Sequence, residues 1–421
     1  MKIVHLNNFD IVGGAARACY SIHNSLLQNN IQSRLLVQNK VSQEPTVNSI
    51  VNNSFEKGSR FIRKVIDYSA TKLLCNEEYG RFSFPIFSPS IVDHPLIRNS
   101  DLINLHWINE GFISLGSLKK LAELNIPIVW TLHDMWAFTG GCHYTNDCKN
   151  YISGCSHCPA LKIKGERDFS NSISKKKKEV FNNINLSIVT SSNWLGEEAE
   201  SSLLLKDKKV YVAPTAIDTE IFRARDKKKC KEELNLNKEK LNVLFGTMNL
   251  SDKRKGMHHL IAALEIFNKK YPEYRDKVEF SVFGSLKNST AIDLSFKLNF
   301  LGHKSSNEQI AKCYNAADLF VAPSIQDNLP NTVLESLGCG TPVAAFNIGG
   351  MPDMIEHKKN GYLAKPFSAD DLADGIKWTL QNCSLSDELN VFARQKAVSN
   401  YTFELVGQKY IKIYNEILKM S

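Results

Sequence analysis

The sequence predicts an α/β protein built from two doubly wound, Rossmann-like domains. Short β-branched runs alternate with amphipathic helical patterns along almost the whole chain, and this alternation is typical of parallel sheets with helices on both faces. The runs fall into two series, separated by a polar, lysine-rich stretch at 223–240. A length of 421 residues is too great for one ordinary core and suits two domains.

Each series predicts its own parallel sheet. The first series comprises Ile3–Leu6, Ser33–Val37, Leu102–Leu105, Pro127–Leu132, Leu186–Thr190 and Val210–Ala213. The second comprises Leu241–Thr247, Val278–Phe283, Leu298–Leu301, Leu319–Ala322 and Pro342–Ala345. Helices are expected between them, and the first of these carries an apolar stripe with spacings of three and four at Ala15, Ala18, Cys19, Ile22 and Leu26.

An irregular segment, Val210–Phe222, predicts the boundary between the domains. The expected division is 1–213, 214–400 and a C-terminal helix at 401–421 that packs back toward the N-terminal domain. Ligands of doubly wound sheets bind beyond the carboxyl ends of the strands. We therefore expect the chemistry in a cleft between two facing domains.

Composition excludes several classes of protein. Hydrophobic residues make up 43% and charged residues 23%, and no run of 18 apolar residues predicts a membrane span. The first residues run directly into a strand pattern without a signal-peptide core, so we expect a cytoplasmic protein. The net charge is +8; basic runs such as Lys175–Lys178 suit either a solvated face or attraction to anionic lipid. Without aromatics interleaved on a basic face, nucleic acid is not an expected partner.

The segment Ala322–Pro342 carries the densest chemical signal. A buried strand is followed by a polar loop and by a short helix that begins near Pro330, where proline suits the first helical position. The amides of Asn331 and Thr332 would then form a diphosphate site. Asp327 and Glu335, eight residues apart, suit contacts to a sugar and a ribose. They equally suit a helix N-terminal charge and an ordinary helix carboxylate.

This segment resembles the acidic-pair motif of the family 4 retaining glycosyltransferases, which have the GT-B fold. In that family two glutamates eight apart precede a Gly-Thr-Pro-Val strand; here Asp327 replaces the first glutamate, and Gly340–Val343 matches the strand. Further matching segments are Val212–Asp218 with Phe222, Phe300–Gly302, Ala317–Ser324, Gly349-Gly350 with Pro352, and Asn360-Gly361. The resemblance extends from Gly13 to Gly361. It implies an acceptor-binding N-terminal domain and a nucleotide-sugar-binding C-terminal domain.

The resemblance also implies a donor site without a catalytic metal. The family pattern of Gly-Arg-Leu, a loop and Lys-Gly is matched in its second half by Lys255-Gly256. The first half reads Thr247-Met-Asn249, so Arg254 is the expected substitute for the missing arginine, unless 253–255 is merely a solvated loop. Arg and Lys can neutralise the leaving diphosphate. The full set expected to bind the nucleotide diphosphate sugar is Gly13, Gly14, Arg17, Arg254, Lys255, Gly302, His303, Asn328, Leu329, Asn331, Thr332 and Glu335.

His133 and Asp134 follow the predicted strand Pro127–Leu132 and should lie at its carboxyl edge. A single histidine is often only a structural hydrogen-bonding group. The resemblance implies instead that His133 binds the donor sugar near its reacting carbon, with Asp134 as an acceptor contact or base. The expected catalytic set is His133, Asp134, Asp327 and Glu335. The expected acceptor side comprises His106, Trp107 and Trp136.

Four cysteines, Cys142, Cys148, Cys155 and Cys158, are crowded into one loop. In a cytoplasmic chain four thiolates suit a structural tetrahedral Zn²⁺, with disulfides or free thiols as alternatives. The wider segment resembles a subset of family 4 enzymes that act in bacterial exopolysaccharide, capsule, O-antigen or lipopolysaccharide assembly.

The segment Gly58–Leu74 predicts an amphipathic helix, which either contacts a membrane or packs in the core of the first domain. A membrane contact would be required for a lipid-linked acceptor. The function expected overall is that of a retaining hexosyltransferase acting on a lipid-linked or oligosaccharide acceptor. The alternatives are a non-catalytic nucleotide-sugar-binding scaffold and a GT-B sugar-nucleotide epimerase.

Overall fold

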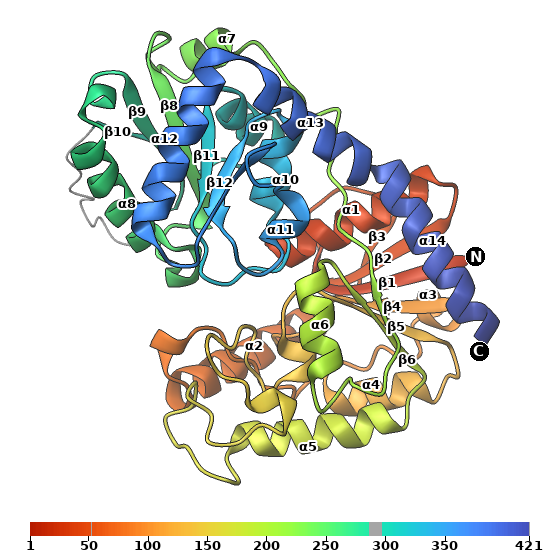
Figure 1. Ribbon diagram of the computed structural model, residues 1–421. Coiled ribbons are helices and arrows are strands. Elements are labelled where there is room, and N and C mark those ends of the chain that lie inside the picture. Colours follow the sequence, from red (N-terminus) through yellow and green to blue (C-terminus); the bar gives the residue numbers. More distant parts are fainter. Residues whose placement is uncertain (52, 286–296, 421) are drawn as a thin grey trace. The chain divides into compact units, whose positions relative to one another are not determined.

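The computed structural model describes residues 1–51, 53–285 and 297–420 (Figure 1). The chain divides into two compact units. Unit 1 comprises Met1–Thr215 with Phe403–Ser421, and unit 2 comprises Ala216–Thr402. The boundaries therefore lie close to the predicted ones at 213 and 400. The C-terminal helix belongs to the same unit as the N-terminal sheet.

Unit 1 is built on a seven-stranded parallel sheet with the strand order β3-β2-β1-β4-β5-β6-β7. The strands are β1 (Lys2–Phe9), β2 (Gln32–Asn39), β3 (Val47–Ser49), β4 (Leu102–Leu105), β5 (Ile128–Leu132), β6 (Leu186–Thr190) and β7 (Val210–Val212). The order reverses between β1 and β4, which pair in register at Leu6 and Leu105. In such sheets this switch point marks the crevice where ligands bind.

Helices of unit 1 lie on both faces of this sheet (Figure 1). The helices of the unit, of which α2 lies away from the sheet, are α1 (Gly14–Gln28), α2 (Ser54–Leu74), α3 (Pro95–Arg98), α4 (Leu115–Ala122), α5 (Phe169–Asn182), α6 (Asn193–Ser201) and α14 (Phe403–Met420). The predicted apolar stripe of α1 is buried at Ala18, Cys19, Ile22 and Leu26, while Ala15 is only half-buried. In α14 the hydroxyl of Tyr414 accepts a hydrogen bond of 2.5 Å from Asn104 on β4.

Unit 2 is built on a six-stranded parallel sheet with the order β10-β9-β8-β11-β12-β13. The strands are β8 (Leu241–Asn249), β9 (Val278–Ser285), β10 (Leu298–Gly302), β11 (Leu319–Ala322), β12 (Val343–Phe346) and β13 (Gly361–Ala364). The switch point lies between β8 and β11. The loops after these two strands carry the predicted donor residues 254–255 and 327–332.

The helices of unit 2 form two layers (Figure 1). One core packs beneath α8 (Met257–Lys270) and α12 (Ala369–Leu385). The opposite core packs beneath α9 (Asn307–Asn315), α10 (Asn331–Gly338) and α13 (Glu388–Asn400). Two short helices, α7 (Lys227–Glu233) and α11 (Met351–Met354), complete the unit.

Every predicted strand has an observed counterpart, and two observed strands were not predicted. These are β3, with three residues, and β13, with four. The helix expected to start near Pro330 begins at Asn331, with Pro330 as the residue before it. In the described part of the chain, no helix combines the length and apolar character needed to cross a bilayer.

Candidate functional site

Asp327 and the two basic residues predicted to bind the diphosphate form one cluster in unit 2. The Asp327 carboxylate lies 2.6 Å from the Lys255 ammonium and 3.2 Å from the Arg254 guanidinium. The Ser324 hydroxyl donates a further hydrogen bond of 3.3 Å to the same oxygen. Burial raises the pKa of Asp327, but the charges of Lys255 and Arg254 outweigh it and lower the value to about 2. Asp327 is therefore a carboxylate held by two cations.

Two close backbone contacts hold this cluster together. The Arg254 guanidinium donates to the carbonyl of Gln326 at 2.9 Å, and Ile325 N–H donates to the carbonyl of Arg254 at 2.9 Å. Gly256 has a φ of +74°, and a Cβ there would lie 1.8 Å from the carbonyl oxygen of Pro323. Gly256 is therefore required both by its conformation and by the contact between the two loops.

Glu335 lies one turn into α10 and is almost fully buried. Its carboxylate accepts a hydrogen bond of 3.1 Å from the Tyr314 hydroxyl. No side chain caps the start of α10, and the first hydrogen bond back to Pro330 comes from Val333 N–H at 3.0 Å. The first turn of this helix therefore has the arrangement of an anion site.

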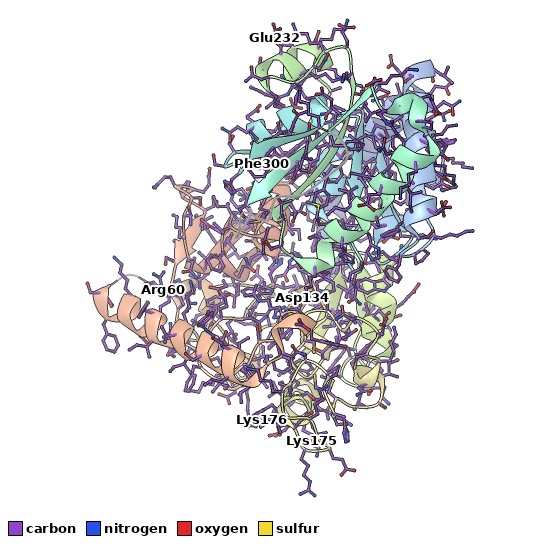
Figure 2. All side chains as sticks on the ribbon, turned by 90° about the vertical axis from the view of Figure 1, so that its left-hand side faces the viewer. Arg60, Asp134, Lys175, Lys176, Glu232 and Phe300 are labelled. Carbon is purple, nitrogen blue, oxygen red and sulfur yellow. The ribbon has the colours of Figure 1, made fainter. Side chains whose placement is uncertain are left out.

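The other predicted donor residues of unit 2 lie at the carboxyl edge of the same sheet. Asn328 and Leu329 are buried in the loop after β11, whereas Asn331 and Thr332 are half-buried. Gly302, with a φ of +72°, ends β10, and His303 follows it with an exposed side chain. Phe300, labelled in Figure 2, precedes them on the same edge strand and is also exposed.

The predicted glycine turn of unit 1 lies between β1 and α1. Gly13 has a φ of +101°, and a Cβ at either Gly13 or Gly14 would meet no atom within 4 Å. The carbonyl of Gly13 accepts the Arg17 amide at 3.0 Å and so starts the helix. The turn thus needs a glycine for its conformation and leaves open space beside its backbone, as a close approach by a phosphate requires.

Asp134 follows the end of β5 and is paired with a histidine that sequence reasoning did not single out. One oxygen of Asp134 lies 2.6 Å from His143 Nδ1, and the other accepts Trp136 N–H at 2.9 Å. The second ring nitrogen of His143 lies 2.8 Å from the Ser83 hydroxyl. Both oxygens of Asp134 therefore have internal partners, and the carboxylate orients His143. A histidine nine residues after an aspartate in an irregular loop gives no spacing signal.

His133, which is half-buried, ends a chain of three histidines whose other two members, His5 and His106, are buried. His5 Nδ1 lies 2.9 Å from His106 Nε2, and His106 Nδ1 lies 3.0 Å from His133 Nε2. Burial lowers the pKa of all three rings, that of His133 to about 4. The rings are therefore neutral near pH 7. Since each then carries one N–H, the tautomer of His106 dictates which nitrogen of His133 is protonated.

Two of the side chains predicted on the acceptor side are too deeply buried for that role. His106 is 3% exposed and lies between the other two histidines, while Trp136 is 2% exposed. The Trp136 indole donates to the carbonyl of Ser83 at 3.1 Å, and the Lys177 ammonium lies 3.5 Å from its ring centre. Trp136 is therefore a core residue, and the prediction of an acceptor contact does not fit it. Trp107 is half-buried, with the Arg81 guanidinium 4.5 Å from its ring centre.

The basic run Lys175–Lys178 contains both exposed and buried lysines. Lys175 and Lys176 project from α5 into solvent (Figure 2), whereas Lys177 is fully buried. Its ammonium donates to the carbonyls of Trp136 and of Thr139, the latter at 3.0 Å. Burial lowers the pKa of Lys177 to about 7. The run Lys175–Lys178 is therefore only partly the solvated face that the sequence suggested.

The two parallel-sheet, Rossmann-like units match the GT-B fold of known glycosyltransferase structures. Residues 226–396 match the family described as glycosyl transferases group 1.

Three known proteins illustrate the similarity. WcaC of Escherichia coli K12, whose name places it in colanic acid biosynthesis as a glycosyl transferase, is 21% identical over 99% of this chain and 100% of its own. The N,N'-diacetylbacillosaminyl-diphospho-undecaprenol alpha-1,3-N-acetylgalactosaminyltransferase of Campylobacter jejuni is 29% identical over 34% of this chain and 39% of its own. The crystal structure of Anabaena HepE in complex with UDP has a TM-score of 0.63 at 16% identity, covering 99% of this chain and 100% of that one. Relatives of this chain are thus named for polysaccharide biosynthesis.

Proposed function

We propose that the protein transfers a sugar from a nucleotide diphosphate sugar to a glycan acceptor, with retention of the anomeric configuration, in cell-surface polysaccharide biosynthesis. The observation that carries this proposal is the cluster of Arg254, Lys255 and Asp327 beside the loop that leads into α10. Two half-buried cations and the first turn of a helix suit a diphosphate. Asp327 pairs with both cations, and the Asp252 carboxylate lies 3.5 Å from the Arg254 guanidinium.

In this mechanism the leaving diphosphate interacts with Arg254 and Lys255, so that no catalytic metal is required. The bond from the anomeric carbon to the phosphate oxygen breaks, and a bond to the acceptor hydroxyl forms on the same face. The acceptor proton passes to the leaving phosphate. No carboxylate then needs to act as a nucleophile, which agrees with the engagement of Asp327 and Asp134 in internal pairs.

The remaining predicted residues have supporting roles in the proposal. Glu335 would bind the ribose hydroxyls, and the open turn at Gly13 and Gly14 would allow close approach of a phosphate. His133, neutral near pH 7, would hydrogen-bond the donor sugar without contributing charge. The binding of UDP by HepE favours a uridine nucleotide as the donor.

We further propose that the acceptor is lipid-linked and that α2 contacts the membrane, at the cytoplasmic face of the inner membrane. α2 has no fully buried residue, and only its C-terminal end, at Ala70 and Leu74, packs against a core cluster of unit 1. Its large apolar side chains are exposed, among them Phe55 at 84% and Leu73 at 71%. The others are Phe61, Ile62, Val65, Ile66 and Tyr68. At 100° per residue, these seven positions fall on one face of the helix.

The opposite face of α2 attaches the helix to unit 1 through polar contacts. Arg60 donates to the side chain of Asn39 at 3.0 Å, and Arg63 donates to the carbonyl of Gly111 at 3.0 Å. Figure 2 shows Arg60 on this helix. An ordinary surface helix packs its apolar face inward, whereas α2 presents that face to the surroundings. Together with its basic side chains, this arrangement suits an interfacial helix on anionic lipid. The Campylobacter relative, named for a diphospho-undecaprenol substrate, agrees with such an acceptor.

The proposal is tested by incubating the purified protein with radiolabelled UDP-, GDP- and ADP-sugars and an extract of lipid-linked saccharides. We expect one donor to label a lipid-soluble product, and proton couplings at the new anomeric centre to show retention. A parallel incubation omits the acceptor. If the protein is an epimerase, the donor sugar recovered from this incubation will be isomerised. Donor binding without any transfer would indicate the scaffold and contradict the proposal.

A further inference from the structure

The four clustered cysteines of unit 1 line one pocket. Its walls come from the loop 139–158 and from Ser170 at the start of α5, and they include Cys142, Cys148, Cys155 and Cys158. All four are free thiols. Four cysteines that line one small pocket in an irregular loop offer a complete ligand set for a tetrahedral ion. This convergence was not guaranteed by the spacing in the sequence, because only the last pair has the usual separation.

The separation of the nearest pair fits a shared ion better than a covalent bond. The Sγ atoms of Cys142 and Cys158 are 3.8 Å apart. A disulfide requires about 2.0 Å. Zn–S bonds of about 2.3 Å in a tetrahedron place neighbouring sulfurs about 3.8 Å apart. Cys148 and Cys155 lie further away and would move inward on binding, since no three cysteine sulfurs in the described residues lie within 4.8 Å of one another.

The chain around the pocket donates one hydrogen bond to a cysteine sulfur and fixes the backbone of two of the cysteines. Gly140 N–H donates to the sulfur of Cys155 at 3.1 Å. The backbone of Cys158 donates to the Asp168 carboxylate at 2.8 Å, and the carbonyl of Cys155 accepts from the Asn171 side chain at 3.0 Å. Such contacts fix ligand orientation around metal sites. The start of α5 therefore supports two of the four cysteines.

A buried cation beside the pocket is the second, independent observation. Lys177 is fully buried, and in the described residues no carboxylate lies within ion-pair distance of its ammonium. The ammonium is instead hydrogen-bonded to the carbonyls of Trp136 and Thr139, and Thr139 itself lines the pocket. A buried cation without an anionic partner is costly. A zinc ion with four thiolates carries a net charge of −2 and would supply that partner.

We propose that Cys142, Cys148, Cys155 and Cys158 bind one structural Zn²⁺ as thiolates, with Lys177 as the buried counter-charge. Binding releases the thiol protons to solvent. All four positions of the ion are taken by protein, so the site is structural and leaves no place for a substrate. The ion braces the loop that carries His143, the partner of Asp134, next to Cys142. The inference does not depend on the proposed sugar transfer.

The test is metal analysis of the full-length protein, purified anaerobically without a metal-affinity tag. We expect about one zinc per chain, released in step with modification of the thiols by a mercurial reagent. Replacement by cobalt should give the absorption of a tetrahedral thiolate site. Cys148→Ser and Cys155→Ser, which change half-buried cysteines, should lose most of the zinc. Cys383→Ser, outside the loop, should retain it.

A second pair of variants tests the counter-charge. Lys177→Met should lose zinc to a chelator about tenfold faster than the wild-type protein, whereas Lys176→Met, its exposed neighbour, should not. Wild-type protein without zinc, with iron instead, or with a disulfide in native mass spectra would overturn the proposal. These measurements of metal content and disulfide state are made on the wild-type protein. The proposal therefore remains testable even if a cysteine variant misfolds.

Discussion

The Lys255 ammonium lies 2.6 Å from the Asp327 carboxylate. The sequence predicted that these residues contact different parts of the donor, one the diphosphate and the other the sugar. In the structure without donor they neutralise one another, with Arg254 as a third member. A donor diphosphate would therefore compete with Asp327 for both cations.

Asp327→Asn should reduce stability in a pH-dependent manner. The pKa of Asp327 is lowered from 3.8 to about 2 in the folded protein, so its stabilising contribution is present above pH 3.8 and is lost as the pH falls through 2. At pH 7 the variant should be less stable by about 2 kcal/mol. Urea unfolding of both proteins between pH 7 and pH 2 measures this. A difference that does not shrink below pH 3.8 would contradict the pairing.

The histidine chain predicts sensitivity to mild acid. The pKa of His133 is lowered from 6.5 to about 4 by burial, so its neutral form contributes stability above pH 6.5 that is lost as the pH falls toward 4. Over this window each such histidine lowers the free energy of unfolding by up to about 1.4 kcal/mol per pH unit. In His133→Gln, the free energy of unfolding should therefore depend less steeply on pH, by up to about 1.4 kcal/mol per pH unit. An unchanged slope in unfolding experiments would show that the ring is not buried as a neutral base.

Gly256→Ala should destabilise unit 2 and weaken donor binding together. The matched control is Gly302→Ala, because Gly302 has a similar φ of +72° but no atom within 4 Å of an added Cβ. The control should cost about 1–2 kcal/mol for backbone strain alone. Gly256→Ala should cost distinctly more, since the added Cβ also meets Pro323. Equal losses in thermal unfolding would remove the argument for a required close contact.

The exposed face of α2 should determine membrane binding. Phe61→Ser and Ile62→Ser should reduce flotation with vesicles containing anionic phospholipid several-fold. Leu385→Ser removes an even more exposed apolar side chain from α12 and serves as the control. If the α2 variants float as well as the wild-type protein, or if the wild-type protein is a dimer that these substitutions dissociate, α2 has a partner other than the membrane.

The sequence predicted the sheets well because buried parallel strands are continuous apolar runs. It also placed Lys255, Arg254 and Asp327 in loops after neighbouring strands, which the topology brings together. The sequence could not predict how deeply individual side chains are buried. His106 and Trp136 follow strand ends, where an exposed side chain is usual, but both turn into the core. The position of a residue at the end of a strand predicts at which edge of the sheet it lies. Its burial depends on how segments distant in the sequence pack over it.

The sequence also could not predict which side chains pair with one another across irregular loops. The pairing of Asp134 with His143 and the burial of Lys177 within a basic run depend on the path of the loop 139–158. For α2, helical periodicity correctly indicated an amphipathic helix, but periodicity does not say which face contacts the protein. Here the polar face does.

Donor binding by the cation pair is the central claim, and a thermal-shift panel of UDP-, GDP- and ADP-sugars tests it most directly. We predict that one nucleotide stabilises the wild-type protein and Lys253→Ala, whose lysine is exposed in the same turn. Lys255→Ala should lose that stabilisation. No stabilisation by any nucleotide sugar, or equal stabilisation of both variants, would contradict the account.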